Sequence, residues 1–144
     1  MKLTSFERTL CVVVLSSFAP LRAPNGLSIR EGEVDWVSGV EKFLTSATQK
    51  ARLGVRFAML LFFAAPFWLH GQLRTLGGAS LAERAEVMGL LLTHRILLVR
   101  ELALLIKLCA CMAMFRVSSL RARTGYDGPA RPAHVLHTLH VRAA

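Results

Sequence analysis

Residues 80–117 read SLAERAEVMGLLLTHRILLVRELALLIKLCACMAMFRV. Apolar side chains recur along them at steps of three and four, which is the spacing of one face of an α-helix. This stripe comprises Leu81, Ala85, Met88, Leu92, Ile96, Val99, Ala103, Ile106, Ala110, Met114 and Val117. The charged residues fall outside the arc centred on the stripe, and charges every few residues are not typical of a membrane span. The pattern therefore predicts packed, amphipathic helical structure.

Local signals divide this stretch into two helices. Ser80 and Glu83 have the spacing of a capping box, which predicts a helix that begins at residue 81. A single helix through residue 117 would be long for a small globular domain, so we expect a bend near Thr93, His94 and Arg95.

The residues before this stretch carry the same helical spacing. We predict a first helix within residues 4–18 with Ser5 as its N-cap, then a loop at residues 20–26, which contain prolines and an Asn-Gly pair. A second helix follows a group of acidic residues, and a strongly apolar third segment covers residues 57–69. The second helix is marked by Glu31, Glu33 and Asp35 near its start, by Val34, Val37, Val40, Phe43 and Leu44 along its apolar side, and by Lys50 and Arg52 at its end or at a bend.

The fold class follows from this spacing. No segment keeps a period of two, so a β-sheet is not expected. We predict an all-α protein, with a compact helical domain of about four to five helices in residues 1–129. A basic, irregular tail that contains histidines follows in residues 130–144.

Composition limits the class of protein further. Of the 144 residues, 18 are Lys or Arg and 9 are Asp or Glu, which gives a formal net charge of +9. Hydrophobic residues make up 53% of the chain, and the mean hydropathy is +0.46. These values exclude a disordered chain, and three cysteines cannot build a disulfide framework. So large an apolar share has to be covered by a core, a partner or lipid.

The most hydrophobic stretch is too short to cross a membrane. Residues 57–73 contain no Asp, Glu, Lys or Arg. As a helix they would span about 25 Å, which is less than the hydrocarbon core of about 30 Å. Two interpretations stay open, a central helix buried by its neighbours and a segment that contacts an anionic membrane surface or a partner. The candidate contact residues are Phe57, Phe62, Phe63, Phe67 and Trp68.

The N-terminal segment bears on location. Its apolar run is short for a secretory signal, and Glu7 and Arg8 are poorly placed for one. We expect a folded first helix rather than a cleaved signal peptide, and a cytoplasmic or peripheral inner-membrane protein.

Residues that could carry chemistry form no complete catalytic motif. His134, His137 and His140 recur every three residues, but on a helix only neighbouring pairs could share a metal ion. Cys109 and Cys111 lie in an apolar helix and are expected to be small buried side chains. Lys and Arg are scattered and accompany no motif that reads nucleic acid. We therefore predict no catalytic residues, no metal site and no nucleic-acid partner.

Two short segments resemble a known family. Residues 76–84, LGGASLAER, are similar to a helix start in that family, and residues 121–129, RARTGYDGP, are similar to its closing turn. Between them the family has an arginine-rich bend and a long apolar helix, to which residues 93–95 and 96–115 correspond. The chain thus resembles the small helical subunit of gluconate 2-dehydrogenase and the similar N-terminal domain of long-chain alcohol oxidases, which accompany glucose-methanol-choline flavoproteins.

The resemblance implies a non-catalytic accessory subunit. Subunits of this family are helical and bind no flavin themselves, so the FAD is expected in a separate flavoprotein chain. The residues expected to bind that partner are Arg121, Arg123, Gly125, Tyr126, Asp127, Gly128 and Pro129. Gly125 and Gly128 permit a tight turn, and Tyr126 has an amphipathic ring suited to a partner's pocket. The alternative is that Tyr126 packs on the chain's own helices and only closes the domain.

Overall fold

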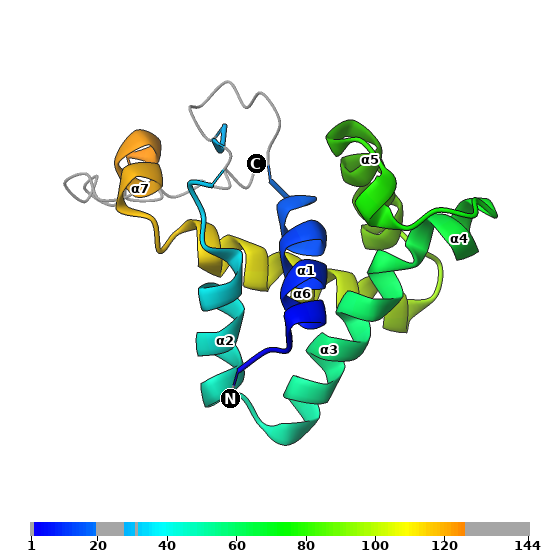
Figure 1. Cartoon of the computed structure of the whole chain (residues 1–144), viewed down its shortest axis with the longest axis horizontal. Coiled ribbons are helices and arrows are strands. Elements are labelled where there is room, and N and C mark those ends of the chain that lie inside the picture. The colour runs from blue at the N-terminus through cyan, green and yellow to red at the C-terminus, as the bar shows by residue number, and fades with distance from the viewer. Residues whose placement is uncertain (1, 20–27, 31, 126–144) are drawn as a thin grey trace, which may run out of the picture.

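The computed structural model of the chain describes residues 2–19, 28–30 and 32–125 (Figure 1). These residues form seven α-helices and one 3₁₀ turn, and no strand occurs among them, so the all-α prediction is confirmed. The elements are α1 (Ser5–Ser16), α2 (Trp36–Ser46), α3 (Gln49–Phe63), α4 (Ala65–His70), η1 (Leu76–Gly78), α5 (Leu81–Leu92), α6 (Leu97–Met114) and α7 (Ser118–Thr124).

The helices outnumber the four to five that the sequence predicts, for two reasons. The apolar third segment is interrupted after Phe63, because Pro66 has no N–H to continue the helical hydrogen bonds of α3 and instead lies in the first turn of α4. A short α7 also follows α6 after a break at residues 115–117. The predicted tail, residues 130–144, lies outside the described residues.

Polar side chains fix where the helices begin. Ser80 and Glu83 form the predicted capping box at the start of α5. The N-cap of α1 is Thr4 and not Ser5 as predicted, because the backbone of Thr4 is extended and its side chain forms a capping box with Glu7. Asp35 accepts a hydrogen bond from the Ser38 N–H at the start of α2.

The corner between α2 and α3 is held by an arginine. Arg52 lies in the first turn of α3 and donates hydrogen bonds to the carbonyls of Thr45 and Ala47, at 3.1 and 3.0 Å. The predicted end or bend near Lys50 and Arg52 is therefore the start of a new helix, where the arginine satisfies carbonyls at the end of α2.

The core lies where α1, α2 and α3 pack on α6. In Figure 1 α6 passes behind these three helices, with α1 between α2 and α3. The core side of α6 is lined by Val99, Ala103, Ile106, Cys109, Ala110, Ala113 and Met114. At the crossing of α2 and α6, a Cβ on Gly39 would lie only 2.7 Å from the Cβ of Ala113. Small side chains therefore let these two helices approach closely.

The long apolar stripe is correct in α6 and only partly correct in α5, where Met88 is buried as predicted but Leu81 is not. The predicted bend is present, since α5 ends at Leu92 and α6 begins at Leu97. The bend interrupts the helical phase, so a single stripe cannot continue across it. Leu81 and Ile96, both on the predicted stripe, are about half exposed at 52% and 51%, while α5 buries Val87, Met88 and Leu91.

Candidate functional site

Gly125 ends α7 in the left-handed region, with φ +68°. Glycine adopts this conformation at little cost, which agrees with the turn predicted there. Tyr126, Asp127, Gly128 and Pro129 lie outside the described residues, so the partner-binding turn stays a prediction.

The two arginines of the predicted site bind groups of the chain itself. Arg123 pairs with the carboxylate of Glu33 and also donates to the Ser28 carbonyl at 3.3 Å. Ser119 donates to the same carboxylate at 2.9 Å. Hydrogen bonds from the Arg30 N–H and from Ser119, followed by the pairing with Arg123, lower the pKa of Glu33. These contacts attach α7 to the segment that precedes α2.

Arg121 also contacts the chain's own backbone. Its guanidinium donates to the Phe115 carbonyl at 3.0 Å, just beyond the end of α6. Both arginines therefore help to position α7, and a partner could reach only the parts of their side chains that these contacts leave exposed.

The aromatic residues proposed for membrane or partner contact separate into two groups. Phe57 and Phe67 are exposed, at 54% and 57% of their surfaces. Phe62 is completely buried in the core, because it lies on the same side of α3 as Val55, Ala58 and Met59. The structure therefore places Phe62 away from any lipid or partner.

Phe63 and Trp68 are half-buried and packed against the chain. The ring of Phe63 lies beside Gly77, where an added Cβ would meet it at 3.3 Å. Trp68 donates from Nε1 to the Leu61 carbonyl at 3.1 Å, and its ring meets His94 edge-on at 5.7 Å. These contacts join α3, α4 and the bend before α6. Among the described residues, no helix is long and apolar enough to cross a membrane.

A second apolar face lies on α6, and it was not predicted from the sequence. Leu97, Leu104, Leu108 and Met112 are 58%, 47%, 55% and 47% exposed, and we call these four residues the outer face of α6. At 100° per residue they lie opposite the core side of the helix. Their separations of seven, four and four residues are the signal that could have revealed this face from the sequence.

Charged residues border the outer face of α6. Arg100 and Lys107 lie along one edge, and Glu101 lies within the face between Leu97 and Leu104. All three are exposed, and none forms an ion pair with another residue of the described chain. Four of the protein's other acidic residues, by contrast, are paired with an arginine.

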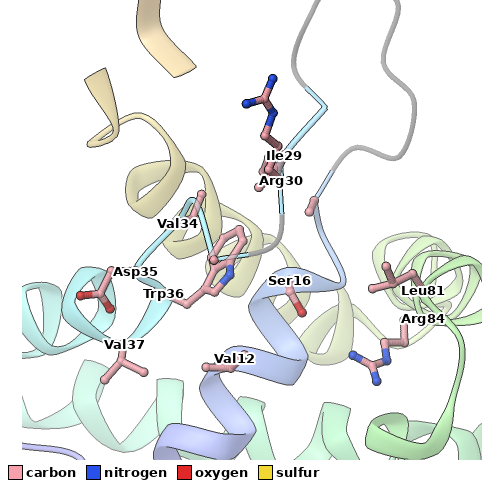
Figure 2. Close-up of a pocket in the computed structure, with 12 residues that line it drawn as sticks. Val12, Ser16, Ile29, Arg30, Val34, Asp35, Trp36, Val37, Leu81 and Arg84 are labelled. Carbon is pink, nitrogen blue, oxygen red and sulfur yellow. The ribbon is translucent and has the colours of Figure 1, made fainter. Parts of the chain in front are cut away.

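A cavity of about 630 Å³ lies between α1, the segment before α2 and the start of α5 (Figure 2). Its described lining is mainly apolar and includes Val12, Val34, Trp36 and Leu81. The polar lining residues are largely engaged: Asp35 caps α2, Ser16 donates to the Val13 carbonyl, and Arg84 donates to the carbonyls of Gly77 and Ala79. The guanidinium of Arg30 points away from Trp36 in Figure 2. The described lining brings together no nucleophile with a base.

Two buried thiols, those of Cys11 and Cys109, are unsuited to nucleophilic chemistry at neutral pH. Burial between α1 and α6 raises the pKa of Cys11 to about 12 and that of Cys109 to about 11. Cys111 is half-buried, so only Cys109 is fully inside as predicted. No group of three or more His, Cys, Asp or Glu among the described residues could hold a metal ion. His134, His137 and His140 lie outside those residues.

No known protein family, curated protein or solved structure matches the chain. The outer face of α6 is an apolar surface that the rest of the described chain leaves uncovered.

Proposed function

We propose that the chain is a non-catalytic, helical accessory subunit that docks on a separate flavin-dependent alcohol or sugar oxidoreductase of the glucose-methanol-choline type. The FAD and the catalytic residues belong to that partner. The resemblance of residues 76–84 and 121–129 to the small-subunit family names the partner class. The all-α fold agrees with this class.

Exposed apolar surface on well-packed helices is the observation that carries the proposal. The outer face of α6 projects four large apolar side chains from a helix whose other side is fully buried. Contiguous apolar surface of this kind typically marks an interaction site. The 7-residue helix α7 ends at Gly125 and leads directly into the predicted partner-binding turn.

A second candidate function has one observation in its favour. Leu53, Phe57, Leu60 and Phe67 are exposed on α3 and α4, and the cation Lys50 is exposed near the start of α3. Apolar residues beside cations suit a helix that lies on an anionic membrane surface. In this alternative the chain is a membrane-associated helical protein anchored through residues 57–69, although Phe62 would take no part.

Co-purification tests the proposed function. An affinity-tagged full-length chain, isolated from the organism that encodes it, should carry a second protein with a flavin absorbance spectrum and a glucose-methanol-choline sequence by mass spectrometry. The chain purified alone should be colourless. Recovery without a flavoprotein, together with sedimentation on phosphatidylglycerol vesicles, would favour the membrane alternative.

Truncation after Arg123 tests the role of the closing turn. The truncated chain keeps the contact between Arg123 and Glu33, so its helices should retain their circular dichroism while flavoprotein capture is lost. A fall in melting temperature before any loss of capture would show that the turn only closes the domain. Unchanged stability and unchanged capture would remove any role for the turn.

A further inference from the structure

The outer face of α6 has the length and composition of a helix-docking surface. From Leu97 to Met112 the backbone rises by about 22 Å, which is about four helical turns. The face consists of Leu and Met side chains, whose size and flexibility suit them to enter the grooves of a second helix. The core side of the same helix already packs on α1, α2, α3 and α5, so this face is the side that the described chain leaves available.

The charges on α6 select the kind of occupant. Arg100 and Lys107 lie about two turns apart along the same edge, and neither has an ion-pair partner within the described chain. A docked helix with acidic residues on the facing edge would pair with both cations. Charge complementarity of this kind favours one partner over another and fixes its register.

Glu101 argues against a lipid occupant. It lies within the apolar face, four residues after Leu97 and three before Leu104. Insertion of this face into a membrane would have to remove water from an unpaired carboxylate, which is costly. A polypeptide can instead supply a cation or a hydrogen-bond donor opposite Glu101.

A second copy of the chain is also a poor occupant. In a two-fold pair with antiparallel α6 helices, each edge of the helix faces the same edge of its partner. The edge with Arg100 and Lys107 would then lie against itself, and like charges across an interface oppose association. The chain's net charge of +9 acts in the same direction.

We propose that the outer face of α6 binds an amphipathic helix of a partner protein, with an apolar seam on Leu97, Leu104 and Leu108 and acidic residues that face Arg100 and Lys107. This inference rests on the proposed function, because it states what the flavoprotein must present to its accessory subunit. It also predicts binding of such a helix in the absence of the flavoprotein.

Two synthetic peptides serve as probes for the full-length chain. Both have about 20 residues and the same leucine seam, and glutamates flank the seam in one while lysines flank it in the other. Fluorescence anisotropy at low salt should show that the acidic peptide binds at least about tenfold more tightly than the basic one. The double variant Arg100→Glu/Lys107→Glu should reverse this preference, whereas Lys42→Glu/Lys50→Glu, on exposed cations of other helices, should keep it.

Apolar variants test the position of the seam. Leu104→Ala/Leu108→Ala should weaken binding of the acidic peptide by about tenfold or more, and Leu53→Ala, an exposed leucine of α3, should not. Circular dichroism melts should show that all these variants stay folded, because the replaced side chains are exposed. Equal binding of the two peptides, or equal loss in the Leu53 control, would overturn the inference.

The same variants distinguish a partner helix from a lipid surface and from a second copy of the chain. Sedimentation on phosphatidylglycerol vesicles that Leu104→Ala/Leu108→Ala abolishes, without any peptide preference, would assign the face to lipid. Self-association of the chain that the same variant abolishes would assign it to a second copy. Flavoprotein capture that survives in this variant would overturn the inference and leave the proposed function standing. Peptide preference without any flavoprotein partner would support the inference and overturn the proposed function.

Discussion

The two sides of α6 are both apolar, yet one is the centre of the core and the other is exposed. Ala103, Ile106 and Ala110 are completely buried on the core side, whereas Leu104 and Leu108 are about half exposed on the outer face. Hydrophobicity therefore does not decide which side of a helix packs inward. Side-chain size separates the two sides more clearly than polarity does.

The core side is the side with the smaller residues. Ala103, Ala110 and Ala113 allow neighbouring helices to approach closely, and Gly39 of α2 meets Ala113 at the tightest point. Close approach buries backbone and side chain together and excludes voids. The longer Leu and Met side chains of the outer face would hold helices further apart, which is the spacing expected at an interface with a partner helix.

A buried charge should separate the two sides most strongly. Ile106→Asp places an unpaired carboxylate at a position with no exposed surface and should unfold the domain, at a cost of several kcal/mol. Leu108→Asp, two residues away on the exposed side, should change the stability by no more than about 1 kcal/mol. Thermal melts followed by circular dichroism measure both. Similar melting temperatures for the two variants would show that the sides of α6 are assigned wrongly.

Cysteine reactivity compares the same two sides without changing the sequence. Cys109 is buried with a pKa of about 11, and Cys111 is half-buried toward the outer face. Because the thiolate is the reactive form, Cys111 should react with an aromatic disulfide reagent at pH 8 at least about a hundredfold faster than Cys109. Cys11, with a pKa of about 12, should be protected as well. Peptide mapping after timed labelling identifies each site, and rapid labelling of Cys109 in the folded protein would contradict its burial.

Glycine substitutions test the close approach on the core side. Gly39→Ala should destabilise the protein by about 1–2 kcal/mol, because its Cβ would overlap with Ala113 and the better helix propensity of alanine offsets only part of the strain. Gly54→Ala in α3 is the matched control, since nothing lies within 4 Å of its added Cβ, and it should stabilise by about 0.5–1 kcal/mol. Urea unfolding curves give both values. A stabilising Gly39→Ala would mean that α2 and α6 lie further apart.

Local signals in the sequence predicted much of this fold. The Ser80–Glu83 capping box and the bend at residues 93–95 were both correct, because each depends on neighbours a few residues away. The first N-cap was wrong by one residue, since Thr4 and Ser5 are both good caps and only the position of Glu7 selects between them. The exposure of Leu81 and Ile96 was not predicted, because the phase of a stripe across a bend depends on tertiary packing.

The candidate site was harder to predict than the fold. Nothing in the spacing of Arg121 and Arg123 shows that Arg123 reaches Glu33, which lies 90 positions earlier in the chain. Composition does not distinguish Phe62 from the other aromatic residues in the stretch 57–69, so it was predicted to be a contact residue. Its position on the core side of α3 places it inside. The outer face of α6 was overlooked because one apolar stripe was enough to explain a helix. Neighbouring residues in the sequence do not show what an apolar residue on the opposite side of a helix contacts.

The smallest expected effect concerns two glutamates, one paired and one on the outer face of α6. A hydrogen bond from Arg74, followed by one from the Ser80 N–H, holds the pKa of Glu83 at about 2, below its usual 4.5. The stability that these contacts contribute is therefore fully present above pH 4.5 and is lost as the pH falls from there toward 2. Because Glu83 is exposed, salt should weaken the effect. Glu83→Gln should flatten the fall of the melting temperature in this window, measured by differential scanning calorimetry at low salt.

Glu101→Gln is the control. It should leave that fall unchanged, since Glu101 has no ion-pair partner in the described chain. If Glu101→Gln flattened the fall of the melting temperature at low pH as much as Glu83→Gln, a cation of the chain itself would have to lie against the outer face. That face would then be occupied already and could not receive a partner helix.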